Sequence, residues 1–158
     1  MVHKKTYSMK FRRRREGKTD YRKRLALLKS DKPRLVVRVT GKNVLAQVIK
    51  YNAKGDEILV AVSSTDVKKL GFNGHTGNSE AAFLTGMLCG ARAVKAGVKE
   101  AVLDIGLHTP VNGSNVFAAL KGALDAGLQI PHDEKCFPAE ERIKTEKGEA
   151  TREKILKG

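Results

Sequence analysis

The first periodic pattern of apolar positions in the chain has the spacing of a short amphipathic helix. Thr19 or Asp20 supplies an N-terminal cap, because a side-chain oxygen at that position accepts a free backbone N–H of the first turn. Tyr21, Leu25 and Leu28 follow at i, i+4 and i+7, so they fall on one face. We therefore predict a capped helix that ends at Leu28.

Three consecutive stretches then alternate between apolar and polar residues with the period of a β-strand. The first, 34–40, turns its apolar side chains to one side and Arg34 and Arg38 to the other, which we expect to be exposed. The second and third span 43–51 and 57–63, and short segments that contain glycine separate the three strands. This pattern predicts a three-stranded antiparallel meander.

The following residues predict helices that alternate with extended segments. Turn-forming residues and glycines in 64–77 indicate a functional loop. Asn78 or Ser79 then caps a stretch, 79–97, that shows helical periodicity with a glycine at its end. A short apolar strand is expected at 101–107, a second helix at 114–126 and a further extended piece at 128–130. The fold class is therefore α/β, with a mixed sheet of the meander plus an additional strand or strands, covered by helices.

The chain divides into three segments by composition. A basic N-terminal extension, which we call the basic arm, covers residues 1–24, and a globular α/β domain covers 25–131. The charged C-terminal extension, 132–158, opens at 138–141 with a proline and two acidic residues, which is typical of a helix start. Its sparse apolar residues predict a partly helical segment that needs a partner surface.

Most of the positive charge lies in the basic arm. The 158 residues carry a formal net charge of +14, and the arm holds eleven basic side chains against two acidic ones. Tyr7, Phe11 and Tyr21 are interleaved with its arginines, and such rings stack on bases while guanidinium groups bind phosphates. RNA is the expected partner, although a solvated charge run or an arm that binds an acidic protein or membrane surface has the same composition.

Several classes of protein lack their signals in this sequence. No apolar run approaches the roughly 20 residues that span a bilayer, and arginines occupy the place of a signal peptide's apolar segment. Cys89 and Cys136 are too few for a zinc site or a disulfide framework. There is no phosphate-binding glycine loop. We expect a cytoplasmic protein without cofactor, metal or membrane contact.

An enzyme would need converging nucleophiles, bases or carboxylates. His75, His108, Asp104 and Ser114 are the candidates, but they form no known catalytic signature. Asp104 lies in an apolar strand, where some metal-dependent nucleases keep a ligand, yet a single carboxylate lacks the company that a two-metal site requires. We expect it to be a sheet-end residue bonded within the protein. The nuclease-like enzyme and a polybasic interaction protein remain the alternatives.

Five ordered blocks give the chain a family resemblance. They are RRRREGKTDY at 12–21, KPRLV at 32–36, TGN at 76–78, LTG at 84–86 and AVLDIGL at 101–107. Together they resemble the large-subunit ribosomal protein eighteen family in its archaeal form, which is related to the longer eukaryotic protein five.

This resemblance covers roughly residues 5–132 and implies a function without catalysis. It implies a ribosomal protein that binds 5S rRNA, contacts large-subunit (23S-type) rRNA and neighbouring ribosomal proteins, and helps attach 5S rRNA in the central protuberance. The family's arm, strand positions and glycine loops correspond to the RNA-binding residues that we expect here. These are Lys4, Lys5, Tyr7, Lys10, Phe11, Arg12, Arg13, Arg14, Arg15, Lys18, Tyr21, Arg22, Lys23, Arg24, Arg34, Arg38, His75, Thr76, Gly77, Asn78, Asn112 and Ser114.

Overall fold

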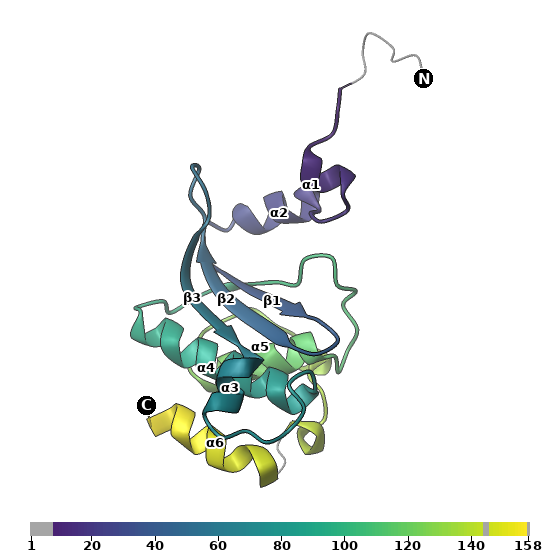
Figure 1. Ribbon diagram of the computed structural model, residues 1–158. Helices are drawn as coiled ribbons and strands as arrows, with labels where there is room; N and C mark the ends of the chain where they lie inside the picture. The colour runs from purple at the N-terminus through teal and green to yellow at the C-terminus, as the bar shows by residue number, and fades with distance from the viewer. Residues whose placement is uncertain (1–7, 144–145, 158) are drawn as a thin grey trace.

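The centre of the computed structural model is a four-stranded mixed sheet (Figure 1). The structure describes residues 8–143 and 146–157. Strands β1 (Arg34–Val39), β2 (Val44–Lys50) and β3 (Glu57–Ser63) form the predicted antiparallel meander, and β4 (Val102–Asp104) pairs in parallel with β1. The strand order is β3-β2-β1-β4, which confirms the α/β class and the mixed sheet. The predicted strand 101–107 is shorter than expected.

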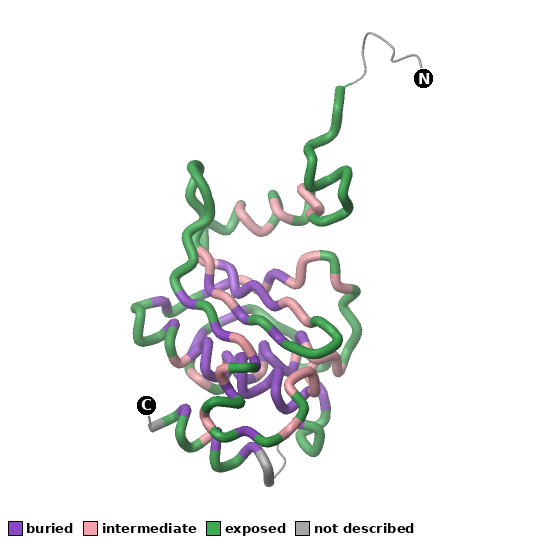
Figure 2. Tube along the Cα trace, viewed as in Figure 1, coloured by how far each residue is buried: buried purple, intermediate pink, exposed green. Residues whose placement is uncertain are grey.

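Two helices cover one face of the sheet. Helix α4 (Ser79–Lys95) begins where Asn78 accepts a hydrogen bond from the amide of Ala81 at 2.7 Å, which confirms the predicted cap. Helix α5 (Asn115–Asp125) packs beside it. Alternate strand residues, such as the fully buried Leu35 and Val37, belong to one core cluster with apolar residues of α4 and α5. The core therefore lies between the sheet and the two helices, where Figure 2 shows the trace as mostly buried.

Glycines bring α4 and α5 close together. A methyl group on Gly86 would collide with the backbone of Ala119, and one on Gly122 would collide with the carbonyl of Phe83. Cys89 lies in the same layer and is fully buried, and burial raises the pKa of its thiol to about 12. These contacts make the helical layer a rigid support for the sheet.

The segment 64–77, expected to be a loop throughout, begins with a helix. Helix α3 (Ser64–Lys69) starts with a capping box, in which the side chain of Ser63 accepts from the amide of Thr65 and the carboxylate of Asp66 accepts from the amide of Ser63. These reciprocal bonds satisfy amides that would otherwise lack partners in the first turn. The expectation was wrong because six residues are too few to show helical periodicity.

The C-terminal extension folds against α4, but its helix begins later than expected. Glu140–Arg142 forms only a short 3-10 turn, η2, after a first such turn, η1 (Glu134–Cys136). The longer helix is α6 (Glu146–Lys157), and it provides the buried Ile155 that packs into the core. The helix opening predicted at 138–141 is therefore wrong, whereas the predicted need for a partner surface is confirmed.

One further extended piece lies outside the sheet. Residues 128–130 contribute a single parallel bridge, between Gln129 and Glu100, and no strand of the four-stranded sheet. One bridge gives a segment too little pairing to extend a sheet.

The basic arm approaches the other face of the sheet through two helices. Helix α1 (Arg12–Arg15) is a single turn, and helix α2 (Tyr21–Leu28) is capped by Asp20, which accepts from the amides of its first turn as predicted. In Figure 1 the sheet separates α2 from α4 and α5. The predicted apolar face of α2 is partly wrong, because Leu25 is 61% exposed while Leu27 and Leu28 are half-buried. In the described part of the chain, no helix is long and apolar enough to cross a membrane.

Candidate nucleic-acid interface

The described part of the basic arm presents cationic side chains to solvent. Every basic residue from Lys10 to Lys23 is exposed, and only Arg24 is partly covered (Figure 2). Within the described residues, five of these side chains have no hydrogen-bond or ion-pair partner: Lys10, Arg14, Arg15, Arg22 and Lys23. A charge without an internal partner keeps its full capacity to bind an external anion.

The other side chains of this segment fold it back on itself. The Nε of Arg13 donates to the hydroxyl of Thr19 at 2.9 Å, and Glu16 pairs with Lys18 at 2.9 Å. The rings of Phe11 and Tyr21 pack with their centroids 5.2 Å apart. Phe11 thus links the turn of α1 to the start of α2 while remaining largely exposed. The predicted contacts Lys4, Lys5 and Tyr7 lie outside the described residues.

Arg34 does not lie on an exposed surface, so that prediction is wrong. Its side chain is only 3% exposed, and its two terminal nitrogens donate to Asp104 Oδ2 and Asp56 Oδ2, each at 2.7 Å. Strand alternation placed Arg34 on the correct face of the sheet. It could not show that α2 and the β2–β3 turn cover this part of the face and supply carboxylates there.

Arg38, two positions along β1, is also bound within the protein but remains partly accessible. It donates to Asp104 Oδ1 at 3.0 Å, to the Asp104 carbonyl at 2.7 Å and to the Val37 carbonyl at 2.8 Å. Its guanidinium lies against Gly106, whose φ of 62° and lack of a side chain allow this approach. The Arg38 side chain is 37% exposed, so one edge of it can still meet a ligand.

These groups form a row of alternating charges across the sheet face. The row, which we call the ion chain, runs Arg24–Asp56–Arg34–Asp104–Arg38. Burial raises the pKa of Asp104, but the charges of Arg38 and Arg34 together with hydrogen bonds from Arg38 and the Gly106 amide outweigh it, so the pKa lies below its usual value. Asp104 is therefore a carboxylate whose negative charge compensates buried arginines.

The same contacts account for Asp104 without a metal. Its two oxygens accept from Arg34, Arg38 and the Gly106 amide, as expected for a sheet-end residue bonded within the protein. Among the residues that the structure describes, no three His, Cys, Asp or Glu side chains are placed to hold a metal ion. Within residues 8–143 and 146–157, the structure therefore places no carboxylate cluster of the kind that a two-metal site requires around Asp104.

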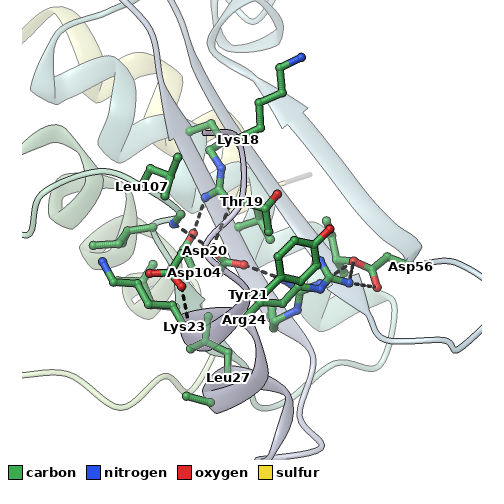
Figure 3. A pocket seen from close by; sticks show the side chains of 18 of the residues that line it. Lys18, Thr19, Asp20, Tyr21, Lys23, Arg24, Leu27, Asp56, Asp104 and Leu107 are labelled. Atoms are coloured by element: carbon green, nitrogen blue, oxygen red, sulfur yellow. Dashed lines mark hydrogen bonds and ion pairs between the residues drawn. The ribbon is translucent and has the colours of Figure 1, made fainter. Parts of the chain in front are cut away.

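A pocket of about 820 Å³ separates α2 from the sheet (Figure 3). Its lining combines basic side chains of the arm, Lys18 and Lys23 among them, with apolar residues of the sheet such as Val36 and Ile49. Tyr21 lines it as well, and the ion chain forms part of its wall. Such a surface offers cations for phosphates beside apolar area for the face of a base.

The two predicted glycine loops, 75–78 and 110–114, lie beside each other. Asn115 joins them, because its amide nitrogen donates to the Gly77 carbonyl at 2.8 Å and its oxygen accepts from the Ser79 hydroxyl at 2.8 Å. Thr76 donates to the Lys42 carbonyl at 2.6 Å. This attaches the first loop to the β1–β2 turn, which lies at the opposite end of β2 from Asp56.

Several groups in these loops are engaged within the protein. The amide of Gly77 donates to His75 Nδ1, and the side chain of Asn78 caps α4. Ser114 Oγ is buried and has no partner in the described residues. His75 and Asn112 are exposed, so they are the members of the predicted set that are open to a ligand here. His108, another candidate, accepts from the amide of Val39 at 3.4 Å.

Comparison with known proteins shows the family. The family described as ribosomal large subunit proteins 60S L5 and 50S L18 matches residues 5–99 and 95–133. This chain belongs to that family. It is 55% identical to the large ribosomal subunit protein uL18 of Methanothermobacter thermautotrophicus over 146 residues, which are 92% of this chain and 76% of the relative. It is 57% identical to the uL18 protein of Methanococcus maripaludis over 137 residues, 87% of this chain and 71% of that relative.

The family membership confirms the resemblance seen in the sequence and its archaeal form. It leaves the individual RNA contacts as predictions. Asp56 is the residue that sequence reasoning missed, because an aspartate in a turn beside Gly55 is typical of ordinary turn chemistry. Its role becomes visible only when α2 is placed over the sheet.

Proposed function

We propose that this protein is a structural constituent of the large ribosomal subunit that binds 5S rRNA through its basic arm. In this proposal it also helps attach 5S rRNA to large-subunit rRNA in the central protuberance. The arm, residues 1–24, is the principal RNA contact, the domain 25–131 fixes its orientation, and 132–158 braces α4. Family membership supports the ribosomal role, and the charge arrangement supports the division of labour.

The observation that carries the proposal is the set of five exposed cations from Lys10 to Lys23 whose side chains have no partner in the described part of the chain. Folding a domain with unpaired like charges costs self-repulsion, and a polyanion removes that cost by neutralising them. Arginine suits phosphate because its planar group donates two parallel hydrogen bonds. The exposed ring of Phe11, beside Tyr21, adds a surface on which a base or sugar can pack.

The domain offers a second, weaker contact. His75 and Asn112 are exposed on loops that Asn115 joins, and Arg38 keeps one accessible edge. These groups suit large-subunit rRNA or a ribosomal neighbour that reaches the sheet from its β1–β2 end. This contact explains how one small protein joins two RNA molecules: the arm and the loops lie on different parts of the surface.

Deleting residues 1–18 tests the proposal. The deletion removes eight basic side chains and one acidic one, and it leaves the Asp20 cap, α2 and the sheet in place. We expect circular dichroism and thermal unfolding to resemble those of the full chain. Affinity for 5S rRNA should fall by at least about tenfold, or roughly 1.4 kcal/mol. The affinity for an unrelated structured RNA of similar length, measured in parallel, is the control for specificity.

Residual binding should then depend on the domain. Truncated protein that binds 5S rRNA as tightly as the full chain would move recognition from the arm to the folded surface. Equal affinity of the full chain for both RNAs would leave the basic arm as a general polyanion-binding segment and contradict the assignment of 5S rRNA.

A further inference from the structure

Asp56 joins the arm helix to the sheet. It lies in the β2–β3 turn, and both of its carboxylate oxygens accept from Nη2 of Arg24 at 2.8 Å (Figure 3). Its Oδ2 also accepts from the buried Arg34 at 2.7 Å. The carboxylate is therefore held between an arginine of α2 and an arginine of β1.

Little else fixes α2 to the sheet. No residue of the helix is buried, and the pocket of about 820 Å³ lies between it and the strands. In the described part of the chain, the Arg24–Asp56 contacts are the only hydrogen bonds and ion pairs between a side chain of α2 and the sheet. A helix so sparsely packed is held in place mainly by this charged contact.

The body side of the contact is rigid. Arg34 is 3% exposed and also donates to Asp104, so Asp56 is supported by a buried group in the central strand. The turn itself is ordered by the Asn52 side chain, which accepts from the Lys54 amide at 3.2 Å. Arg24 of α2 is thus bound to a carboxylate that a buried arginine of the central strand supports.

We propose that Asp56 is a positioning residue for RNA binding, which clamps α2 through Arg24 and so sets the direction in which the basic arm leaves the body. The inference rests on the proposed function, because the arm must bind RNA for its direction to matter. Without the clamp, α2 samples several positions, and RNA binding must restrict it again. That ordering lowers affinity even though no RNA contact is removed.

The direction in which RNA affinity changes when Asp56 is neutralised distinguishes a positioning role from a purely electrostatic one. A carboxylate near RNA repels phosphates, so its neutralisation raises affinity if Asp56 acts only through its charge. Positioning predicts the opposite direction. Glu57 is the matched control, since it is the next residue, is exposed, and its side chain has no hydrogen-bond or ion-pair partner within the described part of the chain.

The first measurement compares Asp56→Asn with Glu57→Gln in the full chain, with 5S rRNA as the probe. Both variants lose one negative charge, at adjacent positions where the β2–β3 turn meets β3. We expect Asp56→Asn to bind at least about fivefold more weakly than Glu57→Gln, the effect of ordering about one residue's backbone again. Equal or tighter binding by Asp56→Asn would overturn the proposal.

The second measurement needs no RNA and leaves the Asp56–Arg34 contact intact. Nitroxide labels on cysteines at Leu25 of α2 and Lys68 of α3, both exposed, report the distance between helix and body. The native Cys89 and Cys136 are buried and so compete poorly for the label. We expect Arg24→Gln to broaden the distance distribution. Arg22→Gln, on the same helix but with no side-chain partner in the part of the chain that the structure describes, should leave it as narrow as in the parent.

The two measurements fail differently. A parent chain that does not bind 5S rRNA would overturn the proposed function, while the label distances would still report whether the clamp exists. An unchanged distribution in Arg24→Gln would overturn the clamp even if 5S rRNA binds. If Asp56→Asn does not fold, Arg24→Gln takes its place. A broader label distance in Arg24→Gln, together with weaker 5S rRNA binding by Arg24→Gln than by Arg22→Gln, would support the proposal. An unchanged distance or equal binding would overturn it.

Discussion

The basic arm and the sheet face are both rich in arginine, yet they use it in opposite ways. Arg14 and Arg15 are exposed and have no partner within the described residues, whereas Arg34 is 3% exposed and lies between two carboxylates. A buried charge needs compensation because water no longer solvates it, and an exposed charge does not. The pairing of an arginine therefore separates the residues that we propose bind RNA from those that hold the fold.

Arg24 and Arg38 lie at the two ends of the ion chain and combine both conditions. Each is bonded to a carboxylate, but each keeps part of its side chain accessible, 33% for Arg24 and 37% for Arg38. They lie between the buried pairs of the ion chain and the exposed surface that we propose binds RNA. The experiments below separate the two roles.

The largest expected effect is on the structural side, at Asp104. Asp104→Asn removes the charge that compensates Arg34 and Arg38, and loss of one partner of a buried pair costs about 3 kcal/mol of unfolding free energy. Urea unfolding followed by circular dichroism measures this loss. Asp125→Asn is the control, since Asp125 forms only a partly exposed pair with Arg152 at 3.8 Å and should change stability by less than about 1 kcal/mol. Similar losses in the two variants would contradict the structural role of the ion chain.

A smaller effect is expected from pH, and it has a definite sign. The pKa of Asp104 lies below its usual value in the folded protein, so its contribution to stability is complete above the unfolded pKa near about 3.9. That contribution is lost as pH falls through the lower, folded pKa. The stability gap between the parent and Asp104→Asn should therefore be constant from about pH 7 to 5 and shrink toward about pH 3. A gap that widens on acidification would reverse the sign and contradict the pairing.

Much of the fold followed from local patterns. The three-stranded meander, the Asp20 and Asn78 caps and the helices at 79–97 and 114–126 were predicted to within a few residues. In each of these elements, the spacing of the apolar residues or a capping side chain determines the type and position of the element. Helix α3 was missed because its six residues are too few to show a helical period. The start of α6 was placed too early because the proline and acidic residues at 138–141 lead into only a 3-10 turn.

The site was less predictable than the fold. The charge excess of the arm is visible in the sequence, because it depends only on which residues the segment contains. The burial of Arg34 and the role of Asp56 are not, because both depend on where α2 lies over a sheet whose strands are separated from it in the chain. Alternation in a strand gives the face of a side chain but not what covers that face.

The most direct test of the central claim, that the unpaired arm charges bind the RNA, is the salt dependence of 5S rRNA affinity in Arg14→Gln/Arg15→Gln. Loss of two phosphate contacts should reduce the slope of log affinity against log salt by about 2 and leave thermal unfolding unchanged. The control, Lys68→Gln/Lys99→Gln, removes the same charge from exposed body positions and should keep the parent slope. Equal changes of slope in both double variants, or no change in either, would contradict the claim.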